Sequence, residues 1–328
     1  MGKKENKRKS NLKLSLLLLL LAAILLISSS YAWFTSNQTV TVSSLNVNVE
    51  AKNGLQISTD ATNWKSVISN ADITGANATY PTNVNQVPAT LEPVSTAGAV
   101  TEGKLDMFYG TVEADEGTGD YMLTAVKETD TAGTNGKYIA FDLFLRVDKD
   151  TPVYLTSSSG VTFTDADTKG MENAARMAFL VQGNKAVGTS ATEIQALKGA
   201  VESKIWEPNY DVHTPAGIAN ANDTYGITTT ATGGSLLTYD GIKSVITSDD
   251  NVNIKTANKT THSTLFDTPT ISYSTVKDFT DNQSLLTLTA GITKIRVYMW
   301  IEGQDVDCEN NASGSNIKFD LQITSNNA

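Results

Sequence analysis

Cysteine and histidine are almost absent from this chain of 328 residues. The single cysteine, Cys308, excludes a disulfide bond within the chain, and a chain of this length can bury enough apolar surface to fold without one. Cys308 is therefore either a buried small apolar residue or half of a bond between two chains, and we favour the buried position. The two histidines, His213 and His262, lie in separate polar segments, which predicts exposed loop positions rather than zinc ligands.

The motifs of the common enzyme classes are also missing. The sequence has no His-Glu-x-x-His pair for a zinc peptidase, no Gly-x-Ser-x-Gly around a nucleophilic serine, and no glycine-rich loop for a phosphate or a dinucleotide. The sequence therefore predicts a protein that is not an enzyme and that has no cofactor.

Acidic residues are the remaining candidates for a metal site. The stretch 165–176 begins like a calcium-binding loop, but Lys169 stands at a ligand position and Arg176 stands where a bidentate glutamate is required. Near the C-terminus, three alternating carboxylates would project from one face of a strand, so they are calcium candidates: Asp305, Asp307 and Glu309. The simpler interpretation is an acidic strand end in solvent, and we predict no metal site.

Aromatic residues make up only 7% of the chain. Trp64, Trp206 and Trp300 are scattered along it and form no platform on which a sugar ring would stack. Each is as easily a partly buried residue of a sheet. The sequence therefore gives no specific indication of a carbohydrate-binding role, although such a role is possible.

Only one long apolar run is present. It covers residues 14–27, follows a basic start, and precedes small residues at Ser30 and Ala32, which is the pattern of a secretory signal peptide cleaved between Ala32 and Trp33. The alternative is an uncleaved membrane anchor, although a spanning helix needs about 20 apolar residues. In both cases the rest of the chain is exported. There is no Leu-Pro-x-Thr-Gly sorting signal, so covalent attachment to a cell wall is unsupported.

The sequence Tyr-Ala-Trp-Phe-Thr-Ser-Asn at residues 31–37 directly follows the apolar run. This junction resembles the signal end of bacterial proteins that are processed by SipW-type signal peptidases, the family that contains TasA and the camelysins. Residues 300–308 resemble the C-terminal strand and turn of secreted proteins with the same type of signal. The resemblance implies an exported protein of the cell surface or biofilm matrix. Camelysins have been classed as metallopeptidases, but this chain lacks the motif, so that activity is not carried over.

Charge limits the partners of the exported part. Loss of residues 1–32 would leave 19 basic and 34 acidic side chains, a formal net charge of −15. A polyanion or an anionic lipid surface would be repelled, so we predict no nucleic-acid partner and no membrane contact beyond the signal segment before cleavage. Signal peptidase is the partner expected during export.

Alternating apolar and polar residues predict strands along most of the chain. The clearest ranges are 45–50, 137–147, 294–302 and 317–323. The range 176–181 contains good helix formers but precedes a hairpin signal, and we predict a strand there. One short helix is predicted within 192–201, where apolar residues recur at helical spacing.

These elements predict an all-β protein with an antiparallel, jelly-roll-like β-sandwich. Residues 33–328 would form one secreted domain behind the N-terminal signal helix. Two polar insertions interrupt the strand pattern. The first, 69–102, contains three prolines and is predicted as a long surface connection. The second, 209–261, is rich in glycine and threonine and is predicted as an elaboration on the core or a mobile loop.

The function expected from these observations is structural. After cleavage, the segment 33–44 is extended and half apolar, so it would add a strand to the open sheet edge of a second copy through Phe34, Val40 and Val42. Repeated strand exchange of this kind gives self-association into a fibre. The alternative is a monomeric surface adhesin whose long loops bind a carbohydrate or a protein.

Overall fold

The computed structural model describes residues 39–50, 54–115, 117–163, 170–234, 236–273, 284–308, 314 and 316–325. The predicted signal segment and its cleavage site at Ala32 and Trp33 lie outside these residues, as do Phe34 and Glu309. Among the helices that the described ranges contain, none is long and apolar enough to cross a membrane.

The chain is all-β in class, with 43% of the described residues in strands and 11% in helices. Two sheets are large. The seven-stranded sheet contains β17 (Leu286–Leu288), β10 (Thr151–Leu155), β19 (Asn316–Thr324), β1 (Val40–Glu50) and β3 (Val67–Ser69), with β11 (Gly160–Phe163) on β19 and β4 (Thr90–Leu91) on β1. The six-stranded sheet contains β16 (Ile271–Tyr273), β13 (Glu202–Trp206), β12 (Ala175–Lys185), β18 (Gly291–Ile301), β9 (Ile139–Val147) and β2 (Gln56–Ser58).

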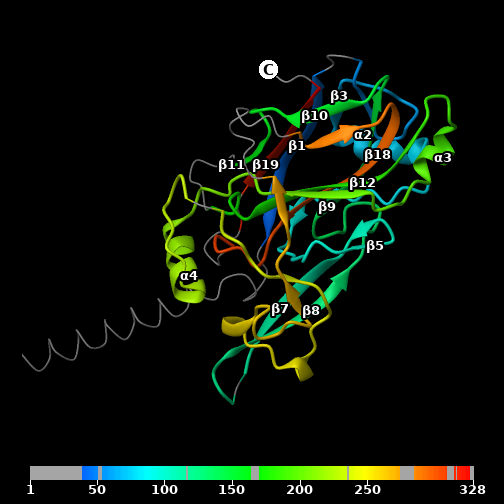
Figure 1. Cartoon of the computed structure of the whole chain (residues 1–328). Coiled ribbons are helices and arrows are strands. Elements are labelled where there is room, and N and C mark those ends of the chain that lie inside the picture. Colours follow the sequence, from blue (N-terminus) through cyan, green and yellow to red (C-terminus); the bar gives the residue numbers. More distant parts are fainter. Residues whose placement is uncertain are drawn as a thin grey trace, which may run out of the picture.

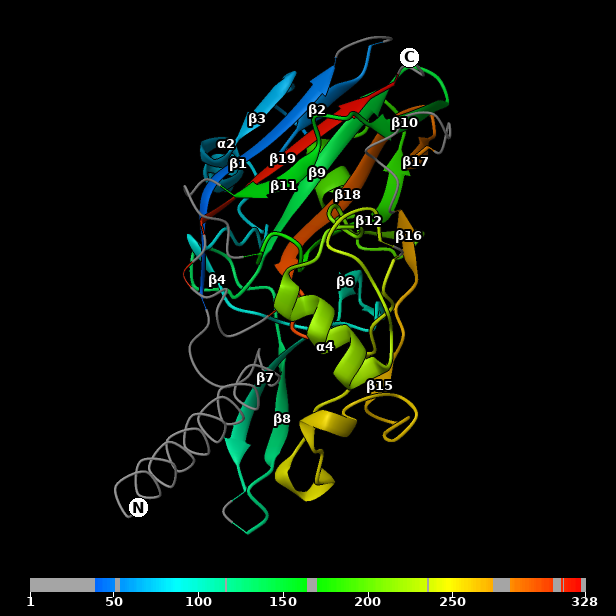
Figure 2. The ribbon, with the colours of Figure 1, turned by 90° about the vertical axis from the view of Figure 1, so that its left-hand side faces the viewer.

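Two strand pairs run parallel, which corrects the expectation of wholly antiparallel sheets. β1 pairs in parallel with β19, and β13 pairs in parallel with β16. Figure 2 shows β1 in blue beside β19 in red, so the earliest and latest strands of the described chain are neighbours. A parallel pair needs a long connection, and here almost the whole chain lies between the two strands.

Alternating side chains of both large sheets meet in one apolar core. In β19, Ile317, Phe319 and Leu321 are buried, whereas the residues between them are partly exposed. Phe141 and Leu143 of β9 belong to the same core cluster. The period of two that predicted these strands therefore also identified the side chains that join the sheets.

The six-stranded sheet is covered on both faces, because every residue of β18 is buried. The predicted surface connection 69–102 provides part of this cover, so that prediction is wrong. It contains α2 (Asn70–Gly75), η1 (Ala76–Ala78), β4 and β5 (Val100–Thr101), and its Tyr80 and Gln86 are buried. Polar side chains made this segment look solvated, but many of its polar groups bond to the sheet.

A smaller lobe extends from the two large sheets (Figures 1 and 2). Its main element is the hairpin of β7 (Met107–Ala114) and β8 (Tyr121–Glu128), and residues 240–267 lie alongside it. Phe108 and Leu123 of the hairpin pack with Phe266 in a separate apolar cluster. β14 (Gly241–Ile242), β15 (Phe266–Asp267), η2 (Ser248–Asp250) and η3 (Ile254–Thr256) are the short elements of this second segment, and β6 (Lys104–Leu105) pairs with β5.

The expectation of a single short helix is also corrected. The predicted helix exists as α3 (Ala191–Gln195), but α2 and α4 (Pro215–Tyr225) are further helices. α4 begins with the side chain of Thr214 accepting a hydrogen bond from the Gly217 N–H, and Pro215 occupies the first helical position. It ends at Gly226, whose φ of 66° is the left-handed conformation that glycine adopts without strain.

Candidate functional site

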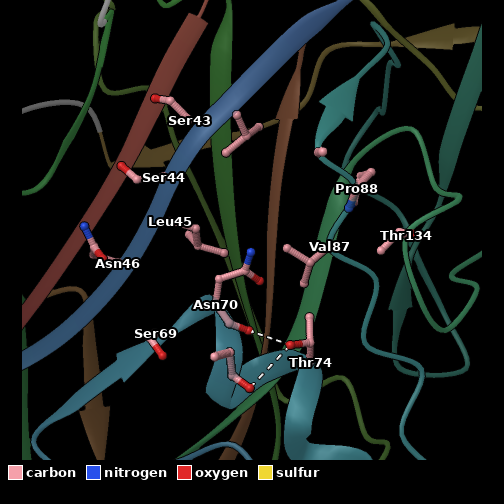
Figure 3. A pocket seen from close by; sticks show the side chains of 13 residues that line it. Ser43, Ser44, Leu45, Asn46, Ser69, Asn70, Thr74, Val87, Pro88 and Thr134 are labelled. Carbon is pink, nitrogen blue, oxygen red and sulfur yellow. Dashed lines mark hydrogen bonds between the residues drawn. The ribbon is translucent and has the colours of Figure 1, made fainter.

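A pocket of about 470 Å³ lies beside β1, where the strand passes from β4 to β3. Figure 3 shows side chains from β1, α2 and the segment around residue 88 surrounding it. Its lining consists of serine, threonine and asparagine together with small apolar residues: Val42, Ser43, Ser44, Leu45, Asn46, Ser69, Asn70, Ala71, Thr74, Val87, Pro88, Ala89 and Thr134.

The pocket arises because two short strands share one side of β1. β4 pairs with β1 at Val40 and Thr41, and β3 pairs with it at 46–48. Between these two strands, residues 42–45 border the pocket. The register between β1 and β19 also shifts between Val42 and Ser44, as in a β-bulge, and Ser43 Oγ donates a hydrogen bond to the Ile317 carbonyl at 2.9 Å.

The pocket lining has a definite chemistry. None of the lining residues is charged or aromatic. Seven of them carry a hydroxyl or an amide, and the others are small and apolar. Four of these groups are already engaged within the chain. Thr74 Oγ1 donates to the Asn70 carbonyl at 3.0 Å (Figure 3), and the side chains of Ser43, Asn46 and Ser69 also donate hydrogen bonds. The lining suits an uncharged ligand held by hydrogen bonds and offers no side chain with the usual pKa of a general acid or base.

Of the predicted strand-exchange residues that the structure describes, only Val42 lines this pocket. Val40 is fully buried in β1 opposite Leu91, and Val42 is half-buried and lines the pocket. Residues 40–44 therefore already belong to the chain's own sheet.

Two of the calcium candidates, Asp305 and Asp307, lie in the bend and turn that follow β18 and not on a strand, because β18 ends at Ile301. Asp305 forms an ion pair with Arg176, and Asp307 Oδ2 lies 2.8 Å from His213 Nδ1. The side chains of Asp305 and Asp307 are only 8% and 1% exposed, so the interpretation as a solvated acidic end is wrong. Over the ranges given above, no group of three or more histidine, cysteine, aspartate or glutamate residues is placed to hold a metal ion.

His213 corrects another expectation, because it is buried rather than exposed in a loop. Its partner Asp307 is 94 residues away in the sequence, so no local signal marked the pair. The same carboxylate accepts hydrogen bonds from the N–H of Thr214 at 2.7 Å and from its hydroxyl at 3.1 Å. Cys308 beside it is buried, as predicted.

Buried charged side chains also form a cluster on the face of the six-stranded sheet that lies opposite the main core. Arg296 bonds to Asp130 at 2.8 Å and to Asp142 at 2.7 Å, and Lys294 Nζ lies 3.2 Å from Asp142. Burial alone would raise the pKa of Asp142, but the adjacent Arg296 and Lys294 lower it below its usual value. The hydroxyl of Tyr80 donates to Asp142 at 2.8 Å, so this cluster fastens the 69–102 segment to the sheet.

The three tryptophans within the described residues form no surface platform. Trp206 and Trp300 are buried, and Trp300 Nε1 donates to Glu302 at 3.1 Å. Trp64 is half-buried, with the Arg146 guanidinium 5.9 Å from its ring centre. These positions agree with residues that pack in or against sheets.

No family model, no curated protein and no solved structure matches this chain.

Proposed function

We propose that the protein is an exported structural component of the bacterial cell surface or biofilm matrix, and that copies assemble by adding a strand beside β1. The two large sheets act as a jelly-roll-like sandwich, the rigid body of each subunit. The resemblance of residues 31–37 to SipW-type signal ends supports export. The proposal includes no enzyme activity.

The observation that carries the proposal is the pocket between β3 and β4. It lies along residues 42–45 of β1, so an extended segment bound there would lie against a strand in the manner of sheet augmentation. Its uncharged lining matches the sequence of residues 33–38, Trp-Phe-Thr-Ser-Asn-Gln, which has no charged side chain. The segment 33–38 of one copy is therefore the occupant of this pocket in the next copy.

This contact uses different surfaces on the two partners. The donor is the chain before β1, and the acceptor is the pocket beside β1. Such a head-to-tail contact does not close on itself unless the rotation between copies forms a ring, so it propagates into a filament. Because residues 40–44 stay in their own sheet, each subunit keeps its core during assembly.

Electron microscopy of protein that begins at Trp33 tests the assembly. We expect filaments, and we expect their loss when the chain begins at Thr39. Ala71→Arg places a charged side chain in the pocket at an exposed position of α2, and it should reduce filament formation strongly. Ala78→Arg is the matched control, since Ala78 is exposed but does not line the pocket. Filaments from the chain that begins at Thr39 would rule out this donor segment.

Export is tested separately by N-terminal sequencing of secreted material, which should begin at Trp33. An intact Met1 on protein retained in the cytosol contradicts export, whatever the assembly experiment gives.

The hydroxyl and amide groups of the pocket also favour a second candidate, a monomeric adhesin that binds a neutral carbohydrate. A glycan array with specific hits, together with sedimentation as a monomer from Trp33 onward, would favour this alternative. Hits that Ala71→Arg abolishes and Ala78→Arg retains would locate the sugar in the same pocket.

A further inference from the structure

One carboxylate fastens the start of α4 to the turn after β18. Asp307 accepts hydrogen bonds from the His213 ring at 2.8 Å and from the Thr214 N–H at 2.7 Å. In the same contact, the Asn220 amide donates to the Val306 carbonyl at 3.2 Å. The attachment of residues 207–220 to residues 302–308 therefore includes several buried polar contacts.

The ionisable side chains around this contact include more acidic than basic residues. Arg176 of β12 lies 2.8 Å from Glu207, which follows β13, and it also pairs with Asp305. The ring of Tyr239 lies with its centre 5.5 Å from the Arg176 guanidinium. These side chains also interact electrostatically with one another and form one cluster. Besides Tyr239, the cluster contains the two bases Arg176 and His213 and the four acids Glu207, Glu302, Asp305 and Asp307.

The pKa values of three members make this balance depend on pH. The hydrogen bond to Asp307 raises the pKa of His213 above its usual value, despite burial, which acts in the opposite direction. Burial raises the pKa of Glu207 to about 8 and that of Glu302 to about 7. Near pH 6 Glu207 and Glu302 are therefore uncharged, and His213 is a cation. As the pH rises, His213 loses its charge and the two glutamates gain theirs.

The cluster is incompletely hydrogen-bonded even in the folded state. His213 Nε2 and Glu207 Oε2 are buried, and neither has a hydrogen-bond partner within the described part of the chain. Unsatisfied buried polar groups weaken a contact and favour its opening to water. Local opening of this contact would give both unsatisfied groups access to water.

We propose that the contact between residues 207–220 and residues 302–308 is a pH-sensitive latch, closed at mildly acidic pH and opening locally as the pH rises. The hydrogen bond between His213 and Asp307 holds the contact closed. Ionisation of the buried Glu207 and Glu302 destabilises the closed contact and favours opening. Opening releases the turn 302–308 and loosens Cys308 at its end, whose side chain is 1% exposed in the closed state and packs in the main apolar core cluster.

The direction follows from proton linkage. A group whose pKa is higher in the closed state than in the open state binds protons preferentially when the latch is closed. Its contribution to closure is complete below the pKa of the open state and is lost as the pH rises through the pKa of the closed state. His213, Glu207 and Glu302 all have raised pKa values, so all three weaken closure between about pH 5 and pH 8.

The single cysteine makes the opening measurable. The rate at which a thiol reagent modifies Cys308 is divided by the rate for a small free thiol in the same buffer, which removes the pH dependence of thiolate formation. We expect the normalised rate to increase about tenfold or more from pH 6 to pH 8.5, since one unit of pKa difference corresponds to a factor of ten. Low urea should change this rate little, because the opening is local.

Two variants separate the roles in the latch. His213→Asn keeps a donor near Asp307 without a positive charge, and it should raise the normalised rate at pH 6 about tenfold. Glu207→Gln cannot ionise, and it should reduce the rate at pH 8.5 toward its value at pH 6. His262→Asn is the matched control, since His262 lies outside the cluster, and it should behave as the unmodified protein.

Three results would overturn the latch. The first is a normalised rate that does not change with pH. The second is a His213→Asn protein that protects Cys308 at pH 6 as well as the unmodified protein does. The third is a rate with the same urea dependence as global unfolding, because the thiol would then report loss of the whole fold.

Discussion

Arg296 is the residue on which the buried charges of the six-stranded sheet depend. Its guanidinium bonds to the carboxylates of Asp130 and Asp142 and to the carbonyl of Val84 at 2.9 Å. Its side chain is 1% exposed, so its charge is compensated by these partners and not by water. Because Val84 belongs to the segment 69–102, the contacts of Arg296 hold that segment on the sheet.

Replacing Arg296 should therefore destabilise the whole protein. Arg296→Met leaves two buried carboxylates without their main cation, and we expect a loss of about 3–5 kcal/mol in the free energy of unfolding. Urea denaturation measures this loss. Lys127→Met is the control, because Lys127 pairs with Asp106 at the surface and its removal should change stability by less than about 1 kcal/mol. Similar effects of the two substitutions would contradict the role given to Arg296.

The buried glutamates predict an unusual pH dependence of stability. Glu207 and Glu302 have pKa values of about 8 and about 7, above those of glutamates in an unfolded chain. The native state therefore binds more protons than the unfolded state between about pH 4.5 and pH 8, and stability falls as the pH rises through this range. Thermal unfolding followed at pH 5 and pH 8 should give the higher midpoint at pH 5. Glu302→Gln should flatten the profile, and a midpoint that rises toward pH 8 would show that these carboxylates are ionised in the native protein.

At the scale of elements, β19 joins strands from distant parts of the chain. It pairs with β1 on one side and with β10 and β11 on the other. Phe319 is fully buried in the core cluster that both sheets share. The packing of β19 therefore decides whether the seven-stranded sheet holds together.

Truncating Phe319 should show this directly. Phe319→Ala removes a buried ring from between the sheets, and we expect a loss of about 3–5 kcal/mol in the free energy of unfolding. The neighbouring Lys318 pairs with Asp320 at the surface, so Lys318→Ala should have an effect of about 0.5 kcal/mol or less. A small effect of Phe319→Ala in chemical denaturation would place the main stabilising contacts elsewhere.

The elements show where sequence patterns suffice. β9, β12, β18 and β19 were predicted because their alternation and flanking turns are local signals. The cover on the second face was missed, because Asp142 and Arg296 alternate with apolar residues and look like the solvent side of a strand. Their burial depends on partners far away in the sequence, such as Asp130 and Tyr80.

The candidate sites were predictable only to a lesser degree. Val42 was identified as part of an extended segment, but the pocket it lines depends on where β3 and β4 stop along β1. A periodic pattern of apolar residues does not indicate where two neighbouring strands leave a gap along a third. The pairing of His213 with Asp307 depends likewise on a tertiary contact, so two residues predicted in solvent are buried together.

At the scale of the molecule, the pairing of β1 with β19 makes folding depend on the complete chain. β1 is the first described strand and β19 the last, and they match over nine residue pairs. Such distant contacts make folding slow, because the chain must close a very long loop before the pair forms.

A chain that ends at Cys308 should therefore fail to fold cooperatively, since β1 then has no central partner. Circular dichroism should show no sharp thermal transition for residues 39–308. Residues 39–328 are the control and should retain one, because they keep every described strand. A cooperative transition in the shorter chain would show that the seven-stranded sheet forms without β19.

The parallel arrangement of these two strands also determines how the molecule responds to tension. If opposite forces act on the start of β1 and on the end of β19, the two strands are drawn past each other along their own axes. The hydrogen bonds between them then resist together in shear, whereas a hairpin pulled from its two ends opens one bond at a time.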